Sequence, residues 1–225
     1  MSLYDSLLLR IFRASVSRST GMPAGDLPGM DGLVDQGRSY MLKLNAEDPS
    51  TADERQADMV RSVLRSLMGP VVPVYRLFMG GIVPSFVGDL LKNDGLKGRQ
   101  VFSGGLPYAP YLTSAVTPLF FQFLVGPARP GRRDDGSRGA VVVEKCRFLE
   151  RSNCKGMCLH ICKAPAQEFF GEELGVPLTV KPNFDTHECH WVWGREPEEV
   201  EDDEEWPRGC LVGCESRKQV AAMAR

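Results

Sequence analysis

The first 145 residues of this chain contain neither cysteine nor histidine. Five of the seven cysteines and all three histidines fall between Glu144 and Gly194. Cysteines that serve only as small apolar core residues would rarely be segregated so completely. The stretch therefore points first to a metal centre, an iron–sulfur cluster or a set of disulfides.

Other features are absent as well. The net charge is only −2, so no basic field indicates nucleic acid as a partner. Prolines interrupt the apolar stretches before any reaches the roughly 18 to 20 residues that a spanning helix needs. Seven cysteines cannot all pair, and no secretory signal opens the chain, so we interpret the thiols as largely reduced or metal-bound. No Ser-His-Asp order, Walker loop or dinucleotide fingerprint is present.

The opening segment, Ser2 to Ser19, places leucines and aromatic residues at three- and four-residue spacing. This spacing predicts an amphipathic helix docked on the rest of the protein. Its arginines and serines leave open a second interpretation, the end of an organelle transit peptide.

Two further helices are expected after this segment. The breaker-rich stretch Gly21 to Asp35 predicts a loop, and Gln36 to Asn45 a short helix. Ser50 with Asp53 three residues later has the form of a capping box, which predicts the start of a core-facing helix that ends at Gly69.

The middle of the chain is strongly apolar. Val71 to Leu91 predicts short helical pieces, because proline and glycine recur in it, and Lys92 to Gly105 a polar connection. Leu106 to Val125 is the most apolar stretch and allows two interpretations: a buried core helix, or one wall of a pocket for an elongated apolar ligand.

Three short segments follow different patterns. Gly126 to Gly139 carries glycines, prolines and four arginines, which suggests an exposed linker. Ala140 to Cys146 contains three consecutive valines and predicts a strand. The acidic run Glu196 to Glu205 predicts a solvated loop, since it lacks the Asp/Asn alternation of a calcium site.

The expected fold class is therefore α+β: an N-terminal helical part packed on a small cysteine-rich C-terminal α/β part with a short antiparallel sheet. We expect residues 1–126 to form the helical part that lines an apolar ligand, 127–139 an exposed linker, and 140–225 the cysteine-rich part. The helical and cysteine-rich parts could also form one integrated domain.

Cys154, Cys158 and Cys162 are spaced four residues apart. On a regular helix the outer two would lie about 12 Å apart along the axis, so we expect the helix to begin inside the motif, with Asn153 as N-cap. A further helical segment should open at Pro165 and end near Gly175. Thiols at a helix N-terminus are expected to have a lowered pKa.

Two strands are expected next, Leu178 to Lys181 and Cys189 to Trp193, the second of which could bring Cys189 over the helix. On a strand, His187 shares a face with Cys189 and is a candidate co-ligand, whereas His190 points the other way. His160 lies about 200° around the helix from Cys158, which predicts an ordinary histidine outside the site.

The Cys-x3-Cys-x3-Cys spacing is neither that of a zinc ribbon nor that of the usual ferredoxins. Ligand softness suits zinc and an iron–sulfur cluster about equally, and disulfides remain a third alternative.

Four segments closely resemble the plastid beta-carotene isomerase family of strigolactone biosynthesis, the dwarf-twenty-seven type. They are EKCRFLERSNCKGMCLHICKAPAQEFF, GVPLTVKPNF, the strand from Cys189 to Gly194 and the closing Cys210-x3-Cys214. Weaker similarity covers the first helix, the helix after Ser50 and FFQFLVGP.

This resemblance implies an iron-dependent, reversible all-trans to 9-cis isomerisation of beta-carotene in the chloroplast, in the stroma or at the surface of plastid membranes. The product would be the substrate of a carotenoid cleavage enzyme. No long transit peptide is evident in this sequence. The implied cofactor is iron, expected as an iron–sulfur cluster, and four of its cysteines are favoured as ligands: Cys154, Cys158, Cys162 and Cys189. The wider set of candidate ligands is Cys146, Cys154, Cys158, Cys162, Cys189, Cys210, Cys214 and His187.

The hypothesis for catalysis is that the iron centre lowers the double-bond character of one polyene bond while an apolar tunnel selects which bond rotates. No individual catalytic residue is assigned. Two other classes of function stay open: an iron–sulfur electron-transfer protein, and an interaction module stabilised by zinc or disulfides.

Overall fold

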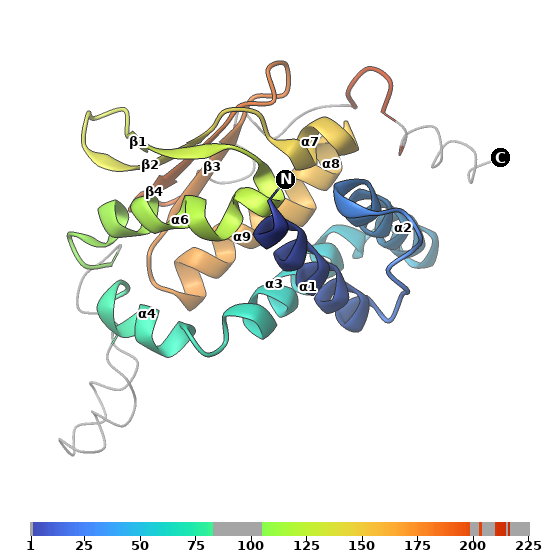
Figure 1. The fold of residues 1–225 in the computed structure, drawn as a ribbon, viewed down its shortest axis with the longest axis horizontal. Coiled ribbons are helices and arrows are strands. Elements are labelled where there is room, and N and C mark those ends of the chain that lie inside the picture. Colours follow the sequence, from blue (N-terminus) through green and yellow to red (C-terminus); the bar gives the residue numbers. More distant parts are fainter. Residues whose placement is uncertain (1, 83–104, 199–202, 204–209, 215, 217–225) are drawn as a thin grey trace, which may run out of the picture.

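The computed structural model describes residues 2–82, 105–198, 203, 210–214 and 216 of the 225-residue chain. The described part confirms an α+β fold in which N-terminal helices pack against a small antiparallel sheet (Figure 1). None of the described helices is long and apolar enough to cross a membrane.

The first helix, α1 (Leu3–Thr20), confirms the predicted amphipathic segment. A capping box begins it: the Ser2 hydroxyl accepts a hydrogen bond from the Asp5 amide, and the Asp5 carboxylate accepts one from the Ser2 amide, both at 3.0 Å. Gly21, with φ of 66°, ends it in the left-handed conformation. Leu9 is fully buried, which docks the helix on the core.

The second helix, α2 (Gly29–Glu47), begins earlier than the sequence predicted. Gly32, which we assigned to a loop, lies inside this helix. Only glycine fits there, because a Cβ atom would lie 2.0 Å from the Leu27 carbonyl oxygen and would also collide with the Arg13 guanidinium. The glycine therefore serves close packing of α1 against α2 rather than a turn.

The third helix, α3 (Ala52–Met68), confirms the predicted core stripe, with Val63 and Leu64 buried, but not its predicted cap. Thr51 is the N-cap and makes no side-chain capping bond. Asp48 organises the turn instead: its carboxylate accepts hydrogen bonds from the Ser50 amide and hydroxyl at 3.0 and 2.7 Å.

After α3 the chain forms the short helix α4 (Val72–Phe78), as the broken apolar pattern predicted. The rest of the predicted helical pieces and nearly all of the predicted polar connection fall at 83–104, outside the described residues. The chain resumes at Gly105 and enters α6 (Ala109–Val125).

Four strands form one antiparallel sheet in the order β1-β2-β4-β3. Their bounds are β1 (Ala128–Arg132), β2 (Arg138–Val143), β3 (Leu178–Pro182) and β4 (Cys189–Trp193). Strands β2, β3 and β4 confirm the predicted ones. The predicted linker at 127–139 is wrong: it holds β1, paired along β2, and the turn between them. The turn residues that suggested a linker belong to a hairpin.

One face of the sheet joins the hydrophobic core. Val143 lies opposite Cys189, and Val141 opposite Trp191, so these side chains point to the same face. All four are buried in a single cluster that also takes in residues of α1, α2, α3 and α6. Figure 1 shows α6 running along the sheet and connecting it to the helical part.

Helical structure continues from the sheet into the cysteine motif. Its segments are α7 (Arg147–Ser152), α8 (Lys155–Cys158), the π-helical turn η2 (Leu159–Lys163), α9 (Ala164–Glu168) and the π-helical turn η3 (Phe169–Glu173). The last four run without a break through Pro165, so the predicted opening of a separate segment there is wrong, whereas their end near Gly175 is as predicted.

Candidate cofactor and apolar ligand site

The cysteine motif straddles two helices. Asn153 was predicted to cap the second helix, but it ends α7 instead, in a left-handed conformation with φ of 41°. Cys154 takes the N-cap position of α8. The helix thus begins inside the motif, as the spacing predicted, but one residue later. Cys158 and Cys162 follow on α8 and on η2, whose wide i→i+5 turn is a distortion often found at functional sites.

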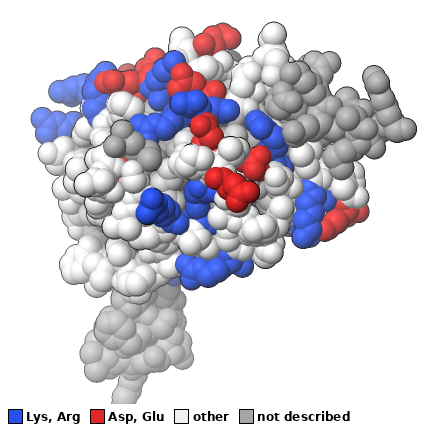
Figure 2. All heavy atoms as spheres, turned by 45° about the vertical axis from the view of Figure 1, so that its right-hand side comes forward, with Lys and Arg blue, Asp and Glu red and all other residues white. Residues whose placement is uncertain are grey.

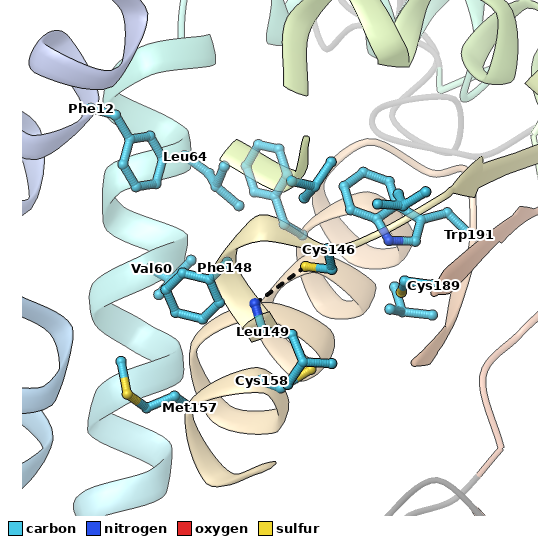
Figure 3. Packing of buried hydrophobic residues seen from close by; sticks show 14 of the residues in the cluster. Phe12, Val60, Leu64, Cys146, Phe148, Leu149, Met157, Cys158, Cys189 and Trp191 are labelled. Carbon is cyan, nitrogen blue, oxygen red and sulfur yellow. Dashed lines mark hydrogen bonds between the residues drawn. The ribbon is translucent and has the colours of Figure 1, made fainter. Parts of the chain in front are cut away.

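Four thiols from four elements, α7, α8, η2 and β4, lie close enough to affect one another's pKa: Cys146, Cys158, Cys162 and Cys189. Cys146 is the N-cap of α7, where its sulfur accepts a hydrogen bond from the Leu149 amide at 3.5 Å (Figure 3). Its own amide donates to the His187 carbonyl oxygen at 2.7 Å, which fixes α7 beside the segment that leads into β4.

The four thiols affect one another electrostatically. Burial raises the pKa of Cys158 and Cys189 well above the ordinary value, and the other thiols of the group raise it further. Burial raises the pKa of Cys162 to about 12, with a smaller contribution from Cys146. Burial also raises the pKa of Cys146. The lowered pKa that we expected from the helix N-terminus is therefore wrong, because desolvation of a buried thiolate outweighs the helix dipole.

A buried lysine lies beside this group. The side chain of Lys163 is only 1% exposed, and its ammonium lies 2.5 Å from a carboxylate oxygen of Asp203. Its charge partly offsets the raised pKa of Cys158 and of Cys189. Asp203 belongs to the acidic run predicted as a solvated loop, and its side chain is only 9% exposed, so the prediction is wrong at this residue.

The remaining candidate ligands lie apart. Burial raises the pKa of Cys154, and the neighbour that adds to this effect is Cys214 rather than any of the four thiols. Cys210 is exposed. His187 has φ of 64° and precedes β4, so strand alternation does not place it on the face of Cys189, and its candidacy as co-ligand loses that support.

The other two histidines lie as predicted. His190 is on β4, on the face opposite Cys189, and its Nε2 is 2.7 Å from a Glu188 carboxylate oxygen. His160 is 3.5 Å from Asp53 on α3.

The four gathered thiols suit iron or an iron–sulfur cluster in donor type, in number and in seclusion from water. Within the described residues no three or more His, Cys, Asp or Glu side chains are close enough together to hold a metal ion. The structure thus brings the right donors into one region without arranging them in a coordination shell, and a bound metal would deprotonate them.

An apolar cavity of about 70 Å³ adjoins this group. Cys162 lines it, and the part of this thiol that remains accessible faces the cavity. Aliphatic side chains form most of the rest, and aromatic rings from α1, α6 and β4 join them: Phe12, Phe121 and Trp191. The rings of Phe121 and Trp191 meet edge to face at 5.9 Å.

A wider apolar groove of about 410 Å³ continues outward between α1, α3, α4 and α6. Four residues line both spaces: Phe12, Leu64, Phe121 and Phe170. The groove falls in the range of small-molecule sites, whereas the inner cavity is too small to take a ligand unless these side chains rotate. The pocket-wall interpretation of Leu106 to Val125 fits this arrangement better than that of a wholly buried core helix.

Sequence reasoning missed Lys163 and Asp203. A lysine directly after a cysteine in an apolar helix was a weak signal, but nothing in the sequence indicated which of the acidic residues would pair with it. It also missed Phe12 and Trp191 as cavity walls, since their approach depends on how α1 and β4 pack on α6.

Comparisons with known proteins give similarity over the same region. Residues 125–202 match the family model described as Beta-carotene isomerase D27-like, C-terminal. The chain is 43% identical over 110 residues to Beta-carotene isomerase D27, chloroplastic, of Arabidopsis thaliana, which covers 48% of this chain and 42% of that protein. It is 29% identical over 224 residues to the Medicago truncatula protein of the same name, covering 97% of this chain and 75% of that protein. No solved structure matches.

Proposed function

We propose that this chain, whose residues 125–202 belong to the D27-like beta-carotene isomerase family, is itself a carotenoid cis–trans isomerase. The two relatives are named beta-carotene isomerases and chloroplastic proteins. These names support a carotenoid as substrate and a plastid as location. We take all-trans- and 9-cis-beta-carotene as the isomer pair and iron as the cofactor.

One observation carries the proposal. Cys162 belongs to the group of four thiols and also lines the apolar cavity. The donor set for a soft metal and the apolar cavity therefore share one side chain. A protein that used its cysteines only to stabilise a fold would have no need of this meeting point.

Cys146, Cys158, Cys162 and Cys189 would hold the iron. When bound, iron supplies one-electron or Lewis-acid chemistry that lowers the double-bond character of a nearby polyene bond. The covering side chains keep bulk water from the site, which strengthens every electrostatic interaction within it.

The other residues of the cavity orient the substrate. Phe12, Phe121 and Trp191 offer flat apolar faces to a conjugated chain, and their positions along the cavity determine which bond reaches the Cys162 end. Lys163 keeps a fixed positive charge next to Cys158 and Cys189, which favours their thiolate forms.

The test is anaerobic purification followed by iron analysis and incubation with all-trans-beta-carotene in detergent micelles. We expect bound iron and formation of the 9-cis isomer, resolved by chromatography. Cys162→Ser should lose most of the iron and at least 90% of the rate. Cys154→Ser is the matched control, because the thiol that influences this buried cysteine is Cys214 and none of the four proposed ligands, and it should keep both.

Each alternative class predicts a different result. A coloured iron protein that leaves the carotenoid isomers unchanged would be an electron-transfer protein. A colourless protein containing only zinc would be an interaction module. Loss of iron in Cys154→Ser but not in Cys162→Ser would contradict the assignment of the four ligands.

A further inference from the structure

Large apolar side chains are exposed on one side of this protein. All of those in the described residues except Leu27 and Val212 lie on or next to α1, α4 and α6. They are Leu3, Tyr4, Leu7, Ile11, Val71, Val74, Leu77, Phe78, Tyr108, Tyr111, Leu112, Val116, Leu119 and Phe120. We call this set the apolar face. Scattered exposed apolar residues are ordinary, but a contiguous set on three neighbouring helices marks an interaction surface.

Helix α6 shows that this exposure is built into the fold. Its small polar residues Thr113, Ser114 and Thr117 are buried, and their hydroxyls are satisfied within the protein: Thr113 by Tyr75 at 2.7 Å, Thr117 by the Thr113 carbonyl oxygen at 2.7 Å. Several of its large apolar residues point outward instead, among them Leu119, 67% exposed, and Phe120, 59% exposed. This reverses the polarity of a helix that faces water.

The apolar groove opens among these exposed residues. Ile11 on α1, Val71 before α4, and Val116 and Phe120 on α6 belong to the apolar face and also line the groove. A hydrocarbon ligand that enters between them would pass from apolar surroundings directly into a groove whose described lining contains no charged side chain.

A basic hollow adjoins the apolar face at α6. Arg129, Arg132 and Arg138 of the β1–β2 hairpin line it together with Tyr111 and Ser114 of α6. The Arg138 guanidinium lies 5.3 Å from the centre of the Tyr111 ring. Arg129 is 3.6 Å from Glu144, an exposed pair that water and salt weaken, and Arg132 donates to the Gly136 carbonyl oxygen.

We propose that the apolar face docks on a lipid bilayer, with the basic hollow binding an anionic headgroup. This rests on the proposed function, since a carotenoid dissolved in the bilayer would then enter the groove from the membrane. Figure 2 shows a broad uncharged surface on its left-hand side, with basic and acidic side chains above it. Apolar residues inserted at the interface and arginines at headgroup level are the two elements that peripheral binding combines.

Charge complementarity favours the bilayer over a second copy of this chain. Symmetric pairing of two apolar faces would cover those faces but would leave the arginine hollow of each copy without an anionic partner, since the second copy presents the same apolar and basic surface. An anionic bilayer satisfies both surfaces at once.

The experiment is flotation of the full chain with vesicles of phosphatidylcholine, alone or with about 30% phosphatidylglycerol, a fraction chosen to give a surface potential of the order found on anionic leaflets. The apolar variant carries Leu7→Gln, Val74→Gln and Leu119→Gln, none of which lines the groove. We expect it to bind at least tenfold more weakly to both vesicle types. Its control, Leu27→Gln with Val212→Gln, replaces the two exposed apolar side chains that lie outside the apolar face and should bind normally.

The basic variant carries Arg129→Gln, Arg132→Gln and Arg138→Gln. We expect it to lose about fivefold in affinity per arginine for the anionic vesicles and little for the neutral ones. Arg55→Gln with Arg65→Gln and Arg151→Gln removes the same charge from exposed positions elsewhere and should have a smaller effect. Equal losses in the two triple arginine variants would mean that general charge attraction, and not the hollow, binds the lipid.

Isomerisation in detergent micelles separates this proposal from the proposed function. Vesicle binding without isomerase activity would leave the docking surface standing and remove the function. Isomerase activity without vesicle binding would overturn the docking surface alone. A stable dimer in light scattering that the apolar variant dissolves would also overturn it, in favour of a second copy.

Discussion

At the residue scale, Lys163 departs furthest from what its type ordinarily does, since lysine is rarely buried without a partner. Its ammonium meets Asp203 at 2.5 Å in a region that excludes water. Removing one member of a buried ion pair strands the other charge, which costs about 3–5 kcal/mol. We therefore expect Lys163→Met to lower the free energy of unfolding by about 3 kcal/mol, measured by urea denaturation.

The matched control for this change is Lys43→Met, which removes an exposed lysine 3.9 Å from Glu47. Exposed pairs of this kind contribute about 0–0.5 kcal/mol. The double variant Lys163→Met with Asp203→Leu removes both buried charges and should recover part of the loss. A Lys163→Met protein as stable as Lys43→Met would show that the buried pair is not formed in solution.

At this scale the sequence predicted where the thiol site lies but not which cysteines belong to it. Segregation of the cysteines was enough to predict one region of thiol chemistry. Spacing alone placed Cys154 with Cys158 and Cys162, whereas in the structure Cys154 turns toward Cys214 and Cys146 joins the other three. The change depends on the hydrogen bond between the Cys146 amide and the His187 carbonyl oxygen, a tertiary contact that no local pattern encodes.

At the element scale, the strands and the long helices were predictable because their hydrophobic periods are strong. The errors fell where a tertiary contact overrides local chemistry. Gly32 and Pro28 both favour a loop, yet α2 begins at Gly29 because α1 and α2 pack so closely that only glycine fits at Gly32. The glycines and prolines of 127–139 serve a hairpin, and its pairing with β2 could not be read from them.

Helix α6 also supports a prediction about access to the thiols. Phe121 lines both the inner cavity and the outer groove, so its ring lies at the junction between them. Phe121→Trp adds volume at this junction. We expect at least a tenfold lower isomerisation rate in micelles with unchanged iron content, because the substrate can no longer reach the Cys162 end.

The control for the junction is Leu119→Trp, two residues earlier on the same helix and pointing outward. It adds an indole without touching either space and should leave the rate in micelles unchanged. Thermal unfolding of both variants within a few degrees of the parent would show that the effect of Phe121→Trp is not a loss of fold. A normal rate for Phe121→Trp would place the route of the substrate elsewhere.

At the scale of the whole molecule, the helical and cysteine-rich parts share one hydrophobic cluster. Helix α6 belongs to the first part by sequence but covers the sheet of the second, so each part alone would expose the surface that the other buries. The boundary at residue 126, which the composition suggested, separates two kinds of side-chain chemistry but does not separate two packed units. We therefore expect a single cooperative unfolding transition for the whole chain.

This expectation can be tested because all three tryptophans lie in the C-terminal part, while the longest helices lie in the N-terminal part. Tryptophan fluorescence and far-ultraviolet circular dichroism should give the same urea midpoint. Leu9→Ala in α1, which removes a fully buried side chain at a cost of about 2–5 kcal/mol, should lower both midpoints equally. If it lowers only the midpoint seen by circular dichroism, the two parts fold separately and α6 is only an interface between them.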